Sequence, residues 1–161
     1  EIDDLIEFDG SSTACSSGFG CYNQVEGTTK SRGLELSGTY AVGAATDLSA
    51  SYTYTDATTD GARLTRTPRH DLVLGVDTEV TARLGASLDI RYVGDVLPSA
   101  FAPADNKVGD YTIVGLGVTY GLTDTAQAYL RVENLFDEDY ETAGGFNMPG
   151  RAAYIGLRAD F

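Results

Sequence analysis

The last eleven residues of the chain, 151–161, alternate between apolar and polar side chains. One set of positions holds Ala153, Ile155, Leu157, Ala159 and Phe161, and the other holds Tyr154, Gly156, Arg158 and Asp160. Side chains of a β-strand point alternately to its two faces, so this pattern predicts a strand with one apolar and one charged face. An apolar aromatic residue at the end of such a strand is typical of a transmembrane β-barrel.

The composition is compatible with a membrane barrel without requiring one. No run of 18 or more apolar residues occurs, which excludes a transmembrane helix. The mean hydropathy of -0.14 and the 42% of hydrophobic residues would also suit a soluble β-protein. Because a membrane barrel has polar residues in its lumen, its mean hydropathy does not distinguish it from a soluble β-protein. The pattern of apolar residues along the chain has to distinguish the two.

Similar alternation predicts eight antiparallel strands in an all-β fold. The predicted strands are 1–9, 31–43, 47–56, 70–78, 83–93, 110–121, 125–135 and 151–161. A tilted strand needs roughly 9–11 residues to cross a bilayer, which is about the length of each segment. The pattern is weakest over 1–9, and Val73 and Ile113 fall with the polar set of their strands.

The predicted connections alternate in length. The short ones are 43–46, 79–82 and 122–124, and the long ones are 9–30, 57–69, 94–109 and 136–150. Outer-membrane barrels have short periplasmic turns and long external loops, which favours a transmembrane barrel. A soluble lipocalin-like or sandwich domain with its apolar face inward stays open as an alternative.

Three local motifs carry a family resemblance. Asn134-Leu-Phe-Asp137 is followed by Asp139-Tyr140 and, before the last strand, by Pro149-Gly-Arg151. Upstream lie Ser31-Arg-Gly-Leu-Glu-Leu36 and Arg66-Thr-Pro-Arg-His70. In this order and spacing the motifs resemble TonB-dependent outer-membrane receptors, and most closely the branch that transports cobalamin and siderophores.

The resemblance implies that the chain is one transmembrane region, 1–161, holding the last eight strands of a 22-stranded barrel. The plug domain and the coupling box of such receptors are not found in these residues, nor are a signal peptide and an initiator Met. We therefore expect a C-terminal portion of a longer receptor. The alternative is a closed, plug-free barrel of eight strands with a structural or adhesive role.

The resemblance also implies a function and a set of partners. The expected function is energy-coupled uptake of a siderophore complex or a cobalamin-like ligand across the bacterial outer membrane. The expected partners are outer-membrane lipid, the barrel-assembly machinery and, if a plug lies upstream, the energy-coupling protein. Tyr154, Gly156 and Phe161 match the terminal assembly signal of such barrels, while Ala159 stands where an aromatic residue is usual.

The polar positions of the predicted strands carry charges of both signs. We expect Asp89, Arg91, Arg131, Glu133, Arg158 and Asp160 to form a network of ion pairs in the lumen. Pairing for structure is the favoured interpretation, and a direct role in a transport path is the alternative.

Net charge is -13, with 11 Lys and Arg against 24 Asp and Glu, which argues against nucleic acid as a partner. Much of the acidic excess lies in the predicted external loops, without the 12-residue pattern of a calcium-binding hand. Arg63, Arg66 and Arg69 are candidate contacts for an anionic ligand, although pairing with acidic neighbours in the loops is favoured.

Cys15 and Cys21 lie in a Ser- and Gly-rich stretch, and in an exported protein they are expected to form a disulfide. No catalytic motif, cofactor site or metal site is predicted. His70, the one histidine, stands apart from the cysteines in sequence, and no nucleophile elbow or phosphate loop occurs. An outer-membrane hydrolase would need a Ser and His pairing that the sequence does not indicate.

Overall fold

The computed structural model describes residues 1–3, 6–9, 20–24, 27–99 and 102–160. These residues form strands, turns and loops, and among them no helix is long and apolar enough to cross a membrane. The strands are β1 (Ile2–Asp3), β2 (Ile6–Asp9), β3 (Cys21–Gln24), β4 (Thr28–Val42), β5 (Thr46–Thr59), β6 (Ala62–Arg63), β7 (His70–Thr81), β8 (Leu84–Gly94), β9 (Tyr111–Gly121), β10 (Ala126–Glu133), β11 (Glu141–Ala143), β12 (Phe146–Asn147) and β13 (Ala152–Ala159).

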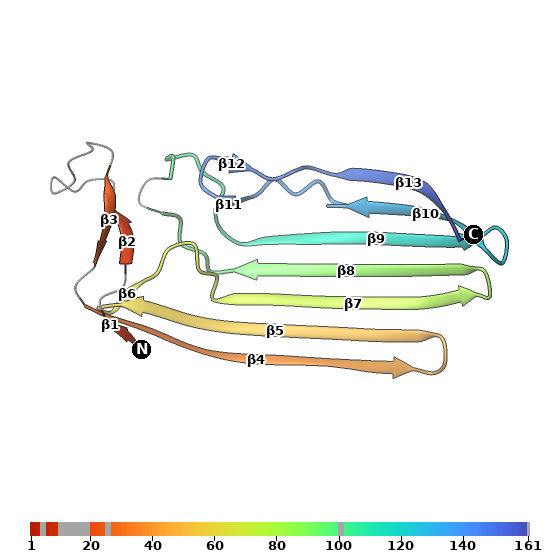
Figure 1. The fold of residues 1–161 in the computed structure, drawn as a ribbon, viewed down its shortest axis with the longest axis horizontal. Helices are drawn as coiled ribbons and strands as arrows, with labels where there is room; N and C mark the ends of the chain where they lie inside the picture. Colours follow the sequence, from red (N-terminus) through yellow and green to blue (C-terminus); the bar gives the residue numbers. More distant parts are fainter. Residues whose placement is uncertain (4–5, 10–19, 25–26, 100–101, 161) are drawn as a thin grey trace. The chain divides into compact units, whose positions relative to one another are not determined.

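The main sheet has the strand order β1-β4-β5-β7-β8-β9-β10-β13, with β6 paired to β5. Strands β5, β7, β8, β9, β10 and β13 pair antiparallel with their neighbours (Figure 1). The described strands do not close into a barrel, because the path ends at β13. The chain divides into two compact units, Glu1–Gly33 with Asp56–Leu64 and Leu34–Thr55 with Thr65–Phe161, which are described separately.

In the first unit, the strand predicted over 1–9 takes a different form. β1 pairs with β4 over two residues, whereas β2 pairs with β3 in a separate two-stranded sheet. Phe8 and Tyr22 meet edge to face across that small sheet, with ring centroids 5.5 Å apart. The prediction of one membrane-crossing strand over 1–9 is therefore wrong for the residues described, because the short alternation of this segment is satisfied by a local hairpin.

In the second unit, the register of the strands gives the sheet two different faces. One row of partners across neighbouring strands is apolar, and it consists of Leu48, Val76, Leu88, Leu116 and Val132. The adjacent row is mostly polar, and it consists of Asp47, Asp77, Ser87, Gly117 and Arg131. Partners in an antiparallel ladder share a face, so the alternation predicted from the sequence is confirmed on the assembled sheet.

In the described part of this unit, the apolar face leaves several large hydrophobic side chains exposed. Val93 and Val114 are the buried hydrophobic residues in the described part of the chain, at 2% and 7% exposure. By contrast, Ile155 is 85% and Leu157 is 75% exposed on the apolar face of β13. A soluble sheet buries such a face against a second layer, so this arrangement suits a face that contacts lipid.

Aromatic residues flank the apolar face at both ends of the strands. Tyr52, Tyr54 and Tyr92 lie on this face toward the long loops, and Tyr120 lies on it next to a short turn. On β9, Thr112 is the strand partner of Tyr92, and Tyr120 lies eight residues after Thr112. At roughly 3.3 Å per residue, the two aromatic levels are therefore about 26 Å apart along the strand. Outer-membrane barrels carry an apolar band of about 25 Å between two aromatic girdles, measured across the membrane.

Short turns join the long strands at one end, as predicted, but one of them is displaced. Gly43 has φ +71° at the first turn, and the turn at residues 122–125 lies where the sequence predicts it. The turn expected at 79–82 is instead formed by Ala82 and Arg83, since β7 continues to Thr81 through an irregularity in its pairing with β8. The Thr81 hydroxyl stabilises this turn by accepting hydrogen bonds from the N–H groups of Arg83 and Leu84.

Four short strands, β3, β6, β11 and β12, lie in segments that the sequence predicts as loops. Each has two to four residues, which is too short to show a period-two pattern. They arise because the chain reverses locally within long loops, as β11 and β12 do around Gly145 at φ +84°.

Candidate functional site at the loop end of the sheet

The polar face of the second unit carries the residues predicted as a luminal charge network. Asp89 and Arg91 lie on β8, Arg131 and Glu133 on β10, and Arg158 on β13, while Asp160 directly follows β13. Their register places the five strand residues on one face. This face borders a groove of about 690 Å³, whose lining includes Asp47, Asp77, Glu79, Asp89, Arg131 and Glu133.

Two separate ion pairs lie on this face, Arg131 with Glu133 and Arg91 with Asp71. Arg131 Nη2 lies 3.3 Å from Glu133 Oε1, and the Arg131 guanidinium stacks 4.7 Å from the ring centroid of Tyr154 on β13. Arg91 binds Asp71 through two hydrogen bonds, Nε to Oδ1 at 3.1 Å and Nη2 to Oδ2 at 2.7 Å. This bidentate geometry fixes the Arg91 side chain on the polar face.

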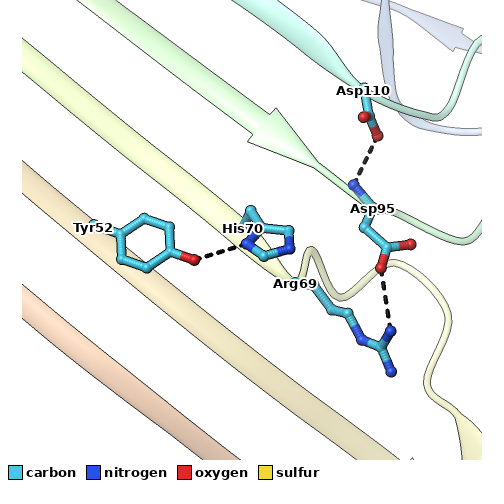
Figure 2. Close-up of polar contacts among 5 residues, drawn as sticks. All are labelled: Tyr52, Arg69, His70, Asp95 and Asp110. Carbon is cyan, nitrogen blue, oxygen red and sulfur yellow. Dashed lines mark hydrogen bonds and ion pairs between the residues drawn. The ribbon is translucent and has the colours of Figure 1, made fainter.

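A polar clasp holds the loop ends of β7, β8 and β9 together (Figure 2). Arg69, directly before β7, forms an ion pair of 3.3 Å with Asp95, which follows β8. The Asp110 carboxylate, directly before β9, accepts hydrogen bonds from the Asp95 N–H at 2.7 Å and from the Tyr92 hydroxyl at 3.1 Å. Asp95 has φ +55°, a conformation that turns the chain sharply out of the strand. Side chains distant in sequence thus fix the end of the loop before β7 and both ends of the loop between β8 and β9.

His70 belongs to the outward, apolar face beside this clasp. The Tyr52 hydroxyl lies 2.8 Å from His70 Nδ1, as Figure 2 shows, and the Tyr54 ring lies 5.5 Å from the imidazole between centroids. The cross-strand pairing of Tyr54 with His70 brings these rings together at the edge of the apolar band. Such a cluster suits the membrane interface, where aromatic rings with polar tips are favoured.

A second clasp joins the two ends of the loop between β10 and β13. Asn134 is 5% exposed at φ +49°, and its side-chain amide donates to the carbonyls of Glu138 and Pro149 at 2.9 and 3.3 Å. Its Oδ1 accepts the Glu138 N–H at 2.8 Å. The Asp137 carboxylate accepts the Arg151 N–H at 2.7 Å. The motif residues Asn134, Asp137 and Arg151 therefore shape the loop.

The three arginines predicted as possible ligand contacts lie in different surroundings. Arg69 is part of the first clasp, and the Arg66 backbone N–H donates to the Leu97 carbonyl at 2.8 Å from a residue at φ +58°. Arg63 pairs with Thr58 in the first unit, where it lies on β6. A ligand contact by any of the three stays a prediction.

Two further predictions concern the chain ends. Tyr154 and Gly156 of the assembly signal lie on the polar face of β13, and the Tyr129 ring covers Gly156, with Cζ 2.6 Å from where a Cβ would stand. Phe161 lies outside the described residues. Cys21 begins β3, but Cys15 also lies outside the described residues, so the disulfide stays a prediction.

Some residues of these clusters were not singled out from the sequence. Asp71, Asp95 and Tyr111 become neighbours of Arg91 or Arg69 only through strand pairing. Asp71 on β7 is the diagonal neighbour of Arg91 on β8, because the direct partner of Arg91 is Val73, and such a diagonal acid–base pair can be recognised once the register is known. Among the described residues, no group of three or more His, Cys, Asp and Glu side chains could hold a metal ion.

Fold and site together define a class: a transmembrane antiparallel sheet with a lipid face, a charged inner face and clasped external loops. The family model described as "TonB dependent receptor-like, beta-barrel" matches residues 1–135. The chain therefore belongs to the TonB-dependent receptors, within their barrel domain, as the sequence motifs indicated.

Curated relatives support the same family. An iron-regulated outer membrane virulence protein of Vibrio cholerae is 34% identical over 71% of this chain. The ferrichrome outer membrane transporter/phage receptor of Escherichia coli K12 is 35% identical over 81% of the chain. The chain spans 19% of the length of each of these proteins. Both relatives are named as outer-membrane proteins, and the second is named as a transporter and phage receptor. The chain is therefore assigned to the bacterial outer membrane and, as part of a receptor barrel, is not an enzyme.

A solved structure shows the same fold. The ferric-catecholate import receptor Fiu of Escherichia coli K12, in its closed form, superposes with a TM-score of 0.76 over 99% of this chain and 24% of its own. Sequence identity is 20%, so this similarity concerns the fold alone.

Proposed function

We propose that the chain is part of a receptor for energy-coupled uptake of a metal chelate across the outer membrane, either a siderophore complex or a cobalamin-like ligand. The observation that carries the proposal is the two-faced sheet of the second unit, with a bare apolar face and a charged, grooved face. The relative named as a ferrichrome transporter supports a chelate as the ligand class. The inner face and the clasped loops would then form part of the ligand path.

We also propose that the chain, 1–161, is a single barrel region completed by strands outside it. Seven strands of eight or more residues occur in the described part, namely β4, β5, β7, β8, β9, β10 and β13. Among the described residues of the segment expected as an eighth strand, 1–9, only Ile2 and Asp3 pair with the main sheet, whereas Ile6–Asp9 pair with β3. This favours a larger barrel over the closed barrel of eight strands.

The partners follow from the same proposal. Outer-membrane lipid would cover the apolar face, and the barrel-assembly machinery would recognise the terminal strand with Tyr154, Gly156 and Phe161. If a plug domain is encoded upstream, the energy-coupling protein would act through it. Asp89, Arg91, Arg131, Glu133, Arg158 and Asp160 would face that plug in the lumen, and the acidic net charge makes nucleic acid an unsuitable ligand.

An uptake assay tests the proposed function. Cells producing the complete receptor would be given radioactive iron as a trihydroxamate or a triscatecholate complex, or radioactively labelled cyanocobalamin. We expect accumulation of at least one probe, and its loss when the proton-motive force is dissipated. A folded, surface-exposed receptor that accumulates none of the three would contradict the proposal, and uptake that survives dissipation would contradict energy coupling.

A further inference from the structure

Two long external loops fold against one another in the second unit, through residues 95–99 and 102–110 of the first and residues 134–151 of the second. Lys107 forms an ion pair with Asp139, and the Lys107 carbonyl accepts the Glu141 N–H at 3.4 Å. Val108 and Glu141 form an isolated parallel bridge. Contacts of the backbone and of side chains thus join segments that are about 30 residues apart in sequence.

Close packing supports these polar contacts. Gly144 lies against Ala102, so that a Cβ added at Gly144 would overlap the Ala102 side chain, and Gly145 lies beside Pro103. Glu141 is 5% exposed, and its Oε2 accepts the Gly145 N–H at 2.8 Å. This buried carboxylate fixes the turn between β11 and β12, which is the part that touches the other loop.

An aromatic contact fixes the joined loops over the polar face of the sheet. The ring centroids of Tyr140 and Tyr111 are 4.4 Å apart, and the planes of the two rings are inclined by 34°. Tyr111 is on the polar face, where its strand partner is Val93. Val93 is 2% exposed, so this end of the polar face is covered. Figure 1 shows β11 and β12 beyond the loop ends of β9 and β10.

We infer that residues 95–99, 102–110 and 134–151 act as one rigid body, which leans inward over the polar face and forms a fixed wall of the receptor's entrance. The two clasps hold its ends, at Asp95 and Asp110 for one loop and at Asn134 for the other. Ligand entry then does not require these loops to separate. That the polar face lines the entrance rests on the proposed function, whereas the rigidity of the body does not.

Amide hydrogen exchange of the complete receptor tests the rigid body. Gly144→Ala should disturb the packing against Ala102 and accelerate exchange in both loops, by about tenfold at the affected amides. Gly109→Ala is the matched control, because no atom lies within 4 Å of the added Cβ, and it should leave exchange unchanged. Tyr140→Ala should act like Gly144→Ala. Acceleration confined to the mutated loop would overturn the inference.

A cross-link tests the fixed wall. Lys107→Cys and Asp139→Cys would be introduced together with Cys15→Ser and Cys21→Ser, and the new pair would be oxidised to a disulfide. Uptake of whichever labelled probe the unmodified receptor accumulates should proceed at the same rate in the oxidised and reduced forms. Slower uptake in the oxidised form alone would overturn the inference. If the unmodified receptor accumulates no probe, the proposed function fails, while the exchange experiment still decides the rigidity.

Discussion

The two ends of the long strands are built in different ways. At the short-turn end, the chain reverses within a few residues, and local groups such as the Thr81 hydroxyl stabilise the turn. At the loop end, the strands are held by side chains distant in sequence, as in the clasp of Arg69, Asp95 and Asp110. A tight turn thus sets the register of the two strands that it joins. A long loop does not set the register, so at the loop end tertiary contacts hold the strands in place.

The largest effect is expected in the band between the two ends. Leu88 lies midway along β8 on the apolar face, so Leu88→Arg should reduce the free energy of unfolding in lipid by about 2–4 kcal/mol. Ser87→Arg, one residue away on the polar face, should cost less because a charge there stays in the lumen. Membrane-integration and urea-unfolding assays would compare the variants. Equal tolerance of both would refute the assignment of the faces.

The clasp of the last loop should be the next most sensitive. Asn134→Ala removes three partly buried hydrogen bonds to the backbone of Glu138 and Pro149, which should cost about 1–3 kcal/mol of unfolding free energy. Glycine tolerates the positive φ at this position but also lacks the side chain. If Asn134→Gly loses less unfolding free energy than Asn134→Ala, the difference measures the backbone strain of the alanine variant. If Asn134→Ala were as stable as the unmodified protein, the clasp would not hold the loop.

Two glycine substitutions test how β10 and β13, which a long loop joins, keep their register. Gly156→Ala places a Cβ against the Tyr129 ring, 2.6 Å from Cζ, and forcing the ring aside should cost about 1–2 kcal/mol. Gly38→Ala on β4 is the control, since nothing lies within 4 Å of its added Cβ. Thermal unfolding of both variants in detergent would measure the difference. Equal midpoints would mean that the Tyr129 contact does not position β13.

The smallest effect is expected at an exposed ion pair. Asp71→Asn removes one partner of Arg91, whose side chain is about half exposed, so the loss should be at most about 1 kcal/mol. A double-mutant cycle with Arg91→Gln would isolate the coupling between the two side chains. A coupling well above 1 kcal/mol would show that this pair supports the loop end as strongly as the buried clasp does.

Seven of the eight predicted strands were recovered because a strand pattern is local. Alternation over eight or more residues, as in β8 and β13, reports directly which face each side chain takes. Val73 and Ile113 were likewise assigned correctly to the polar face, as their pairing with Arg91 confirms. The segment 1–9 failed because its pattern is short and pairs with a nearby partner.

The candidate site was predictable only in part. Five of the six charged residues predicted for the network share one face of the sheet, but the partner of Arg91 is Asp71, a residue outside that set. The displaced turn between β7 and β8 explains the difficulty, because a change in turn position shifts every cross-strand neighbour. The motif at 134–137 identified the family, yet its role as a loop clasp became visible only from its hydrogen bonds.

The sequence by itself determined the strands, the two faces of the sheet and the family, because these depend on period-two alternation and on short motifs that lie within single segments. Only the tertiary structure decided which charges pair, that Tyr129 covers Gly156, and that the loop holding Lys107 joins the loop holding Asp139. These contacts link residues on different strands and loops. Their formation depends on register and on where each loop folds, and no local pattern in the sequence encodes either one.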